Sequence, residues 1–441
     1  MTSPIFRQSL QSTAAPAVVL AALQSLHHVI YLNNNGQPFI ALNATRFQII
    51  QNNTTQVFAA RAWNEYVAST QPFDVALNPY QQNEQTQHNA YVGFVGYDHA
   101  AAQEVNASQR AQPAFFMGYF QSFLRLCDET WIFESSDPNA VNIFQHIHRL
   151  ITESAAQRPF KLTEQCKARW NKQQYVEAFR KVQDYIVAGD CYQINLTQEF
   201  KAKAQGPLLT SANAFWQLTD APYAGYLRID DFELLSCSPE LFIDFAPHRK
   251  MITKPIKGTM PRYADPQQDE ASKQTLINSE KDMAENVMIV DLLRNDLSVY
   301  AETGSVKTPK LFNIESFNQV HHMVSEVEAT LKADIHPFDV LMAALPGGSI
   351  TGAPKIRAMQ IIEELEGAPR GAYCGSMGYF NEDGTGSWNI LIRSIQKYQE
   401  EVSLWAGGGI TIASECDAEY QECFDKVEAM LDLLNTYYKT Q

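Results

Sequence analysis

Two pairs of acidic residues are spaced three positions apart, Asp282 with Glu285 and Glu419 with Glu422. In a helix, residues three positions apart lie on one face, so each pair would present two carboxylates side by side. Four carboxylates on two helices can form an oxygen-only site for a hard cation such as Mg2+. Considered alone, solvated helix faces are the simpler explanation, and an acid near a helix N-terminus also stabilises the helix. The pairs indicate a metal site only if other residues support one.

Three more charged residues could take part in chemistry. Arg393 falls on the apolar face of a predicted strand, 388–398, where a buried cation needs a carboxylate from the protein or from a ligand. Lys257 stands at a predicted strand end, and a lysine is nucleophilic only when it is neutral. Glu240 lies in a predicted turn, where a raised pKa would suit a general acid. By residue type alone, surface positions are the simpler explanation for Lys257 and Glu240.

A glycine-rich loop, 347–355, runs into a predicted helix. Such a loop can offer backbone N–H groups to an anion. It is not a phosphate-binding Walker A loop, because Ala353 and Pro354 stand where Lys and Ser or Thr would follow the last glycine. The sequence also lacks a GxGxxG motif, so nucleotide binding has no support from motifs.

The overall charge limits the partners of the chain. Its 441 residues carry a formal net charge of -15, which argues against a surface for nucleic acid. An anionic substrate would need a local cation or a clustered arginine. Seven cysteines without CxxC spacing favour free thiols in a reducing compartment, and we expect a cytoplasmic protein. No apolar run approaches the roughly 20 residues that span a bilayer, so no membrane segment is expected.

Hydrophobic periodicity predicts the elements that position these residues. Helices are expected at 174–187, 281–294, 354–365 and 415–434. Strands are expected at 90–97, 114–126, 192–200, 234–237, 241–245, 250–256, 372–380, 388–398 and 402–412, the last three as an antiparallel meander. These elements favour an α+β fold with mainly antiparallel sheets. We expect an N-terminal domain at 1–160 and a catalytic domain at 174–436.

Six segments together resemble the chorismate-utilising enzymes, a family that includes anthranilate, aminodeoxychorismate, isochorismate and salicylate synthases. The resemblance covers roughly residues 175–435, a domain-sized unit, whereas 1–160 is only loosely similar to the family's other domain. It implies the fold of anthranilate synthase component I, a sandwich of antiparallel sheets with helices packed outside. The segments are 255–262 (PIKGTMPR), 291–296 (DLLRND), 320–326 (VHHMVSE), 346–359 (PGGSITGAPKIRAM), 373–379 (YCGSMGY) and 407–422 (GGGITIASECDAEYQE).

The resemblance also implies roles for individual residues. Glu285 and either Glu419 or Glu422 would bind Mg2+ directly, and Asp282, where Glu is more usual, would act through water. Arg393 and Tyr373 match residues that hold the enolpyruvyl carboxylate of chorismate. Glu240 matches the general acid for the departing C4 hydroxyl. The other positions that match the substrate site are His322, Thr351, Gly407, Gly408, Gly409 and Lys426.

Two positions distinguish the branches of the family. Isochorismate and salicylate synthases use a lysine to activate water where this chain has Gln193, and a neutral amide cannot serve as that base. Anthranilate synthases usually have alanine where this chain has Lys257. With Gln193 and Lys257, the sequence resembles the aminodeoxychorismate synthase branch of the family. Anthranilate synthase component I is the alternative assignment.

In that branch, the lysine would add at C2 of chorismate while the C4 hydroxyl leaves. Ammonia would then add at C4 and expel the lysine from C2. The product serves 4-aminobenzoate and folate synthesis. The resemblance implies that a separate glutamine amidotransferase supplies the ammonia. Some relatives also hold tryptophan in the N-terminal domain, and for this chain the sequence leaves that point open.

Overall fold

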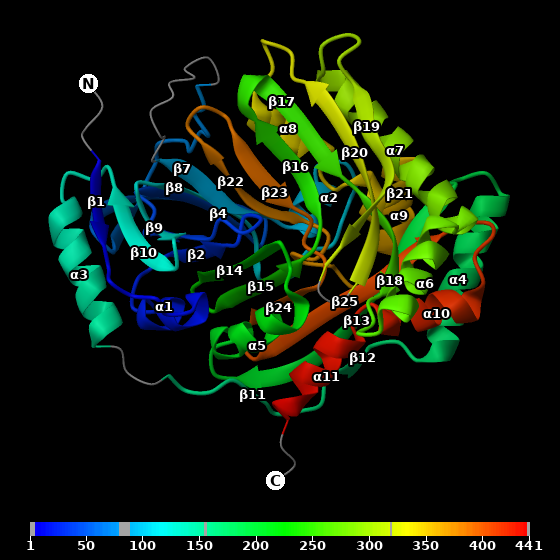
Figure 1. Cartoon of the computed structure of the whole chain (residues 1–441), viewed down its shortest axis with the longest axis horizontal. Coiled ribbons are helices and arrows are strands. Elements are labelled where there is room, and N and C mark those ends of the chain that lie inside the picture. Colours follow the sequence, from blue (N-terminus) through cyan, green and yellow to red (C-terminus); the bar gives the residue numbers. More distant parts are fainter. Residues whose placement is uncertain (1–4, 79–88, 154–156, 318–319, 439–441) are drawn as a thin grey trace.

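The computed structural model describes residues 5–78, 89–153, 157–317 and 320–438. Two large antiparallel sheets make up most of the molecule, and the helices lie mainly around them (Figure 1). The predicted α+β fold with mainly antiparallel sheets is therefore confirmed. No helix in these ranges is long and apolar enough to cross a membrane.

The first sheet contains thirteen of the described strands. Two short strands, β12 (Lys167–Ala168) and β21 (Gly352–Ala353), pair with β13 beside the main order. The main order is β1 (Phe6–Ser9), β10 (Thr130–Ser135), β9 (Ser122–Cys127), β3 (Phe39–Leu42), β2 (Val29–Leu32), β14 (Tyr223–Ile229), β15 (Phe232–Ser238), β24 (Ser394–Tyr398), β25 (Glu401–Ile410), β13 (Gln193–Gln205) and β11 (Lys161–Leu162).

The second sheet contains twelve of the described strands, and β19 (Lys307–Ser316) pairs with β20 beside its main order. That order is β18 (Ile256–Pro261), β20 (Val320–Thr330), β17 (Lys250–Lys254), β16 (Leu241–Ala246), β23 (Gly386–Asn389), β22 (Ser376–Asn381), β7 (Ala90–Val95), β8 (Pro113–Phe120), β4 (Arg46–Gln51), β5 (Thr54–Ala62) and β6 (Glu65–Ala68).

Local sequence explains where the main helices begin. Asn171 and Gln174 form a reciprocal capping box at the start of α4, and Ser279 accepts the N–H of Asp282 at the start of α7. The helices are α1 (Pro16–Ala22), α2 (Tyr97–Ala101), α3 (Ala140–Thr152), α4 (Lys172–Val187), α5 (Leu209–Thr219), α6 (Pro266–Ile277), α7 (Glu280–Tyr300), α8 (Pro337–Ala344), α9 (Lys355–Glu366), α10 (Cys416–Asp425) and α11 (Glu428–Thr436).

Both sheets take strands from the two predicted domains. In the first sheet β2 pairs with β14, and in the second β7 pairs with β22. The ranges 1–160 and 174–436 therefore share one pair of sheets, and their division into two domains stays a prediction from the sequence. The hydrophobic core follows the sheets and includes the fully buried Trp131, Trp388 and Trp405.

The predicted meander at 372–412 is wrong in one respect. Its first pair, β22 and β23, lies in the second sheet, whereas β24 and β25 lie in the first. The expected strand 388–398 is thus two strands, and the chain crosses between sheets around Arg393, whose φ is 52°. Two other segments that were each predicted as one element are also divided in the structure. The predicted helix 415–434 is two helices, α10 and α11, and the predicted strand 114–126 is two strands, β8 and β9.

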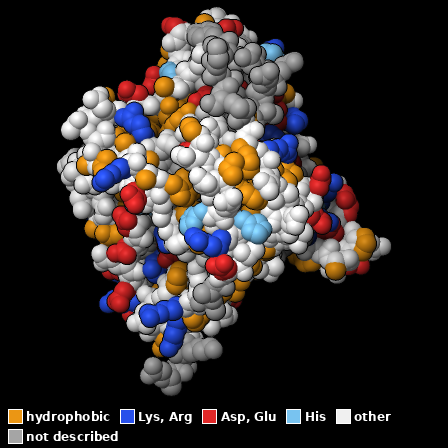
Figure 2. All heavy atoms as spheres, turned by 90° about the vertical axis from the view of Figure 1, so that its left-hand side faces the viewer, with side chains coloured by type: hydrophobic (Ala, Val, Ile, Leu, Met, Phe, Trp, Pro, Cys, Tyr) orange, Lys and Arg blue, Asp and Glu red, His pale blue; other side chains and the backbone are white. Residues whose placement is uncertain are grey.

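The surface carries its excess of acidic residues without a broad patch of one sign on the face that bears α3 and β1. Figure 2 shows acidic and basic side chains scattered there among uncharged ones. Local groups of charge are therefore more informative than the net charge of -15.

Candidate active site

Lys257 lies on β18, partly buried, at the centre of a group of charges. Burial lowers the pKa of Lys257, and the positive charge of Lys426 lowers it further. Glu285, Glu240 and Glu422 act in the opposite direction, so all three carboxylates lie within electrostatic reach of its ammonium group. A lowered pKa increases the neutral fraction that can act as a nucleophile.

Glu240 lies in the turn between β15 and β16 and is 8% exposed. Its carboxylate accepts the backbone N–H of Ile256, the residue that precedes Lys257. Burial raises the pKa of Glu240 to about 7, although Lys257, this hydrogen bond and Lys426 oppose the rise. A carboxyl group of this kind keeps a substantial protonated fraction near neutral pH and can give up that proton, as a general acid must.

Ser238 holds the turn that presents Glu240. Its Oγ accepts the N–H of Glu240 at 3.2 Å and lies 2.5 Å from the carbonyl oxygen of Ile390, to which it donates. The N–H of Ile390 in turn donates to the carbonyl of Glu240 at 3.1 Å. We did not predict this role for Ser238, although a serine two residues before the acid, with proline between them, is a known turn signal.

Two of the predicted metal-binding acids converge from α10. A Cβ added to Gly408 would lie 3.0 Å from Glu419 Oε2 and 3.0 Å from Glu422 Oε1, so both carboxylates approach this glycine. Ser414 donates to Glu419 at 2.7 Å. Lys426 Nζ lies 2.6 Å from Glu422 Oε1 and donates to the carbonyl of Gly407 at 2.9 Å.

The second predicted pair lies on α7. Glu285 belongs to the charge group around Lys257, and its Oε1 is 3.8 Å from Lys281 Nζ. Asp282 packs against β18, because a Cβ added to Gly258 would lie 2.9 Å from its carboxyl carbon. Lys281 also lowers the pKa of both Glu419 and Glu422, which places it near both acid pairs. We did not predict Lys281, although its position four residues before Glu285 suits an ion pair.

The donor set of these acids fits Mg2+. Burial raises the pKa of Glu419, and the nearby charge of Glu422 raises it further, so two like charges meet beside Gly408 and a divalent cation would relieve their repulsion. Among the described residues, no three His, Cys, Asp or Glu side chains gather closely enough to form a ready-made metal group. Glu285, and Asp282 through water, would therefore have to complete the ligands of an ion held by the close pair on α10.

Arg393 is a cation that has no acidic partner within the described part of the chain. It lies in the crossing between β23 and β24, not on the face of a strand, and its carbonyl accepts the N–H of Cys237 at 3.0 Å. No described Asp or Glu lies within ion-pair distance of its guanidinium. Burial lowers the pKa of Arg393, and Tyr373 is among its charge neighbours. A largely desolvated guanidinium without a carboxylate suits a bidentate anion.

His322 lies close enough to Arg393 for the two side chains to interact electrostatically. Burial lowers the pKa of His322 to about 4, and the charges of Arg393 and His321 add to the shift, so the imidazole is neutral. Its Nδ1 is 2.8 Å from Thr259 Oγ1, across the register of β18 and β20. Since β18 also carries Lys257, one strand connects His322 to the charge group around Lys257.

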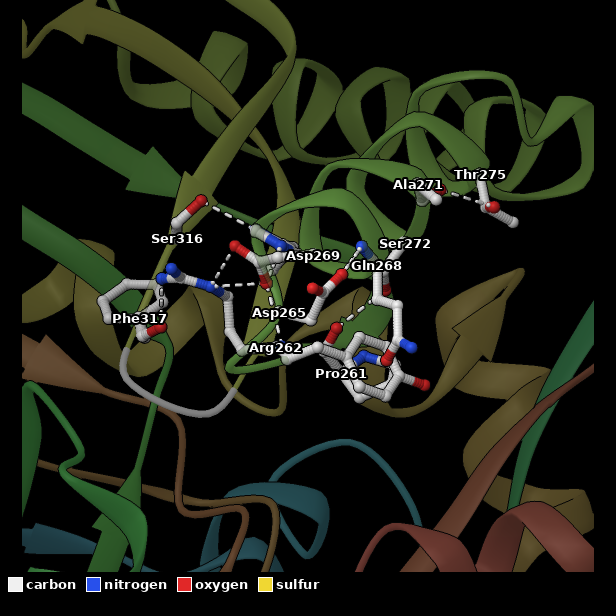
Figure 3. Close-up of polar contacts among 12 residues, drawn as sticks. Pro261, Arg262, Asp265, Gln268, Asp269, Ala271, Ser272, Thr275, Ser316 and Phe317 are labelled. Atoms are coloured by element: carbon white, nitrogen blue, oxygen red, sulfur yellow. Dashed lines mark hydrogen bonds and ion pairs between the residues drawn. The ribbon is translucent and has the colours of Figure 1, made fainter.

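A set of hydrogen bonds fixes the outer end of β18 (Figure 3). Arg262 Nε donates to both carboxylate oxygens of Asp269, at 2.9 and 3.0 Å, and its Nη1 donates to the carbonyl of Phe317 at 3.0 Å. Ser272 donates to the carbonyl of Pro261 at 2.7 Å. This Arg262–Asp269 clamp joins β18 to α6 and so orients the strand that carries Lys257.

Gln193 begins β13 on the other side of the site. It is 3% exposed, and its Nε2 has no hydrogen-bond partner among the described residues. A Cβ added to Gly409 would lie 2.6 Å from that nitrogen, so the amide of Gln193 packs directly over this glycine and would have to shift if a larger residue replaced it. Thr351 is fully buried, and its hydroxyl donates to the carbonyl of Gly347 at 2.9 Å, within the glycine-rich loop.

The predicted residues thus fall into neighbouring groups. The first combines Lys257, Glu240 and Lys426 with the acids, and the second combines Arg393, Tyr373 and His322. Gly407, Gly408 and Gly409 lie on β25 and pair with Thr197, Leu196 and Asn195 of β13.

Proteins with similar sequences include two aminodeoxychorismate synthase components 1. That of Klebsiella aerogenes is 48% identical over 277 residues, and that of Escherichia coli K12 is 47% identical over 278 residues. The matched segments cover 63% of this chain and 61% of each relative, so the match spans less than two thirds of their length. An anthranilate synthase component 1 of Haloarcula marismortui is 38% identical over 267 residues, 60% of this chain and 54% of that protein.

Solved structures with the same fold cover nearly the whole chain. The anthranilate synthase component I of Streptococcus pneumoniae superposes with a TM-score of 0.75 at 23% identity, over 97% of this chain and 99% of that one. The menaquinone-specific isochorismate synthase of Escherichia coli gives 0.72 at 19% identity, over 98% and 95%. A model of chorismate binding enzymes matches residues 27–432, on both sides of residue 160. The chain belongs to the family of chorismate binding enzymes.

Proposed function

We propose that this chain converts chorismate and ammonia to 4-amino-4-deoxychorismate, as an aminodeoxychorismate synthase component 1. The observation that carries the proposal is the closeness of Lys257 and Glu240, whose pKa values are shifted in opposite directions. One becomes more easily neutral and the other more easily protonated, as a nucleophile and a general acid require. The curated relatives with that name support the assignment.

Substrate binding follows from the two groups of the site. Arg393 and Tyr373, beside neutral His322, would hold the enolpyruvyl carboxylate, because Arg393 has no acidic partner among the described residues. Glu285 and either Glu419 or Glu422 would hold Mg2+ directly beside the ring carboxylate, with Asp282 and the remaining glutamate acting through water. When bound, the ion would neutralise that carboxylate and polarise the conjugated ring. Lys426 would add a second positive charge nearby.

The chemistry would proceed in two displacements. The lone pair of Lys257 Nζ forms a bond to C2, both double bonds of the conjugated ring shift by one position toward C4, and the C4–O bond breaks as Glu240 gives its proton to the departing hydroxyl, which leaves as water. Ammonia then bonds to C4, both double bonds shift back to their original positions, and the C2–N bond breaks to release neutral Lys257. The new ammonium group returns a proton to Glu240. Covalent catalysis divides one difficult substitution into two easier steps.

Gln193 favours ammonia over water as the second nucleophile. Its buried amide has no basic nitrogen that could take a proton from water, so the hydroxylation typical of isochorismate synthases lacks its base. Anthranilate synthase component I remains the rival activity. We disfavour it because Lys257 stands where those enzymes usually have alanine.

The ammonia would come from a glutamine amidotransferase partner, and the "component 1" in the names of the relatives supports a second component. All seven cysteines are free, which agrees with a reducing cytoplasm as the setting of the reaction. The product would serve 4-aminobenzoate and folate synthesis. Turnover of glutamine by the purified chain alone would contradict the need for a partner.

Identification of the product tests the proposal. The purified chain is incubated with chorismate, Mg2+ and ammonium, and the product is analysed by liquid chromatography and mass spectrometry. We expect a compound in which one hydroxyl of chorismate is replaced by an amino group and the pyruvyl group is retained. Fluorescent anthranilate or free pyruvate would favour the rival activity, and isochorismate would contradict the role of Gln193.

A further inference from the structure

A cavity of about 240 Å³ lies between β4, β8, α2, α8 and the segment 73–75, away from every residue assigned to the chorismate site. Its wall combines elements from the first 120 residues with one helix from the C-terminal half. Most of the lining side chains are apolar, and two are polar but uncharged. The lining residues are Gln48, Ile50, Phe73, Val75, His99, Phe115, Phe338 and Met342.

Hydrogen bonds hold the segment that forms the outer wall. Tyr91 Oη accepts the N–H of Ala76 at 3.1 Å, and Arg46 donates to the carbonyl of Pro72 at 2.8 Å. The rings of Phe73 and Tyr91 are also in contact, with centroids 6.1 Å apart. Because both ends of 73–75 are tied to the sheet, the cavity is a fixed feature of the described chain.

The two polar side chains of the cavity, Gln48 and His99, are available for hydrogen bonds to a ligand. Neither Gln48 nor His99 makes a side-chain hydrogen bond with another described residue. Burial lowers the pKa of His99, so its ring is a neutral donor and acceptor. The ring of His99 also lies against Phe115, with centroids 5.3 Å apart. The cavity therefore offers aromatic contacts and two neutral hydrogen-bonding groups.

Size and charge narrow the class of ligand. An apolar cavity of roughly 150 Å³ accommodates benzene, and pockets for drug-sized molecules begin near 300 Å³. The present volume falls between these values, which suits one fused pair of rings. The lining has no Lys, Arg, Asp or Glu, so it offers no charged partner to the ammonium and carboxylate groups of an amino acid, and an uncharged ligand fits it better.

We propose that this cavity binds a small, uncharged, bicyclic aromatic molecule that carries one N–H or O–H group. The ring would lie among Phe73, Phe115 and Phe338, and its polar group would bond to Gln48 or His99. This site is independent of the proposed reaction. Its inner wall is nevertheless connected to the chorismate site, because α8, which carries Phe338 and Met342, leads directly into the glycine-rich loop 347–355.

Calorimetric titration of the full chain tests the proposal with indole and naphthalene as probes. Both should bind, and Met342→Trp should weaken both at least about 10-fold by filling the cavity. Val75→Trp fills it from the opposite wall, so it can replace Met342→Trp should that variant fail to fold. Val187→Trp is the matched control, since Val187 is 77% exposed on α4, and it should leave binding unchanged.

The double variant Gln48→Leu/His99→Leu tests the polar contacts. It should weaken the binding of indole by about 3- to 10-fold, which is the effect of losing a neutral hydrogen bond, and leave the binding of naphthalene unchanged. The proposal is overturned if the wild-type chain binds neither probe, or if folded Met342→Trp and Val75→Trp bind indole as the wild type does. Equal loss of both probes in the double variant would overturn the assigned polar contacts.

Discussion

At the scale of single residues, Glu240 and Lys257 depend on one another. Burial disfavours the charged form of each group, which raises the pKa of Glu240 and lowers that of Lys257. Each also stabilises the charge of the other, which opposes the rise in the pKa of Glu240 and the fall in the pKa of Lys257. The residue types were predictable from the sequence, but this balance was not, because it requires Glu240 to lie beside the N–H of Ile256.

The pH dependence of the reaction should report on Glu240. With ammonia itself held at a constant concentration, kcat/KM should fall as pH rises through about 7, because Glu240 loses the proton that it must donate. Glu240→Gln should remove this limb and lower kcat by roughly 100- to 10,000-fold. If kcat/KM of Glu240→Gln falls with rising pH as in the wild type, a group other than Glu240 donates the proton.

Arg393 gives a prediction in which activity and stability separate. Arg393→Met should raise the KM for chorismate on the order of 10- to 100-fold, because charge-assisted hydrogen bonds to the substrate are lost. Its Tm should stay unchanged or rise, since no described carboxylate loses a partner and a desolvated charge is removed. Arg393→Lys, which keeps the charge, is the control for KM. A clear drop in the Tm of Arg393→Met would show that the residue has a structural role.

At the scale of elements, helices with a cap and a regular apolar period were predictable. The predicted helix 174–187 corresponds to α4, and 281–294 corresponds to α7, which extends to Tyr300. The break between α10 and α11 at Lys426 and Val427 lacks any proline or glycine that would signal it. The crossing of the chain between the two sheets at Arg393 was also not predicted. An alternating apolar pattern indicates a strand but does not tell which of two sheets the strand joins.

The Arg262–Asp269 clamp should make the stability of β18 sensitive to acid. The hydrogen bond from Arg262 lowers the pKa of Asp269 from 3.8 to about 2. Between these values the unfolded chain binds a proton before the native one, so the contribution to stability is complete above pH 3.8 and is lost as pH falls toward 2. Acid titration of unfolding should show this loss in the wild type and less of it in Asp269→Asn. Identical acid profiles would contradict the clamp.

At the scale of the whole molecule, the two sheets unite the N-terminal and C-terminal parts of the chain. Only the second part was predicted to carry the chemistry, yet β14 and β22 each need a partner strand from the first. Long-range pairing of this kind leaves little trace in local sequence, because it depends on which edges are free after each sheet forms. Hydrophobic periodicity predicted the α+β class with antiparallel sheets, and the family resemblance supplied the sandwich arrangement of the two sheets.

Removal of residues 1–160 should therefore prevent independent folding of the remainder. The fragment 174–436 would expose the edges of β14 and β22, and exposed edge strands promote aggregation. We expect poor solubility and no cooperative unfolding transition in circular dichroism, with the full chain as control. A soluble fragment that unfolds cooperatively would show that the predicted catalytic domain is a folding unit by itself.

The central claim is that Lys257 bonds to the chorismate ring while Glu240 releases its hydroxyl as water. Intact-protein mass spectrometry after incubation with chorismate and Mg2+, without ammonia, measures this directly. We predict a covalent adduct with the mass of chorismate less one water, located at Lys257 by peptide mapping and absent in Lys257→Met. An unmodified wild-type chain, together with full activity of Lys257→Met, would contradict the account.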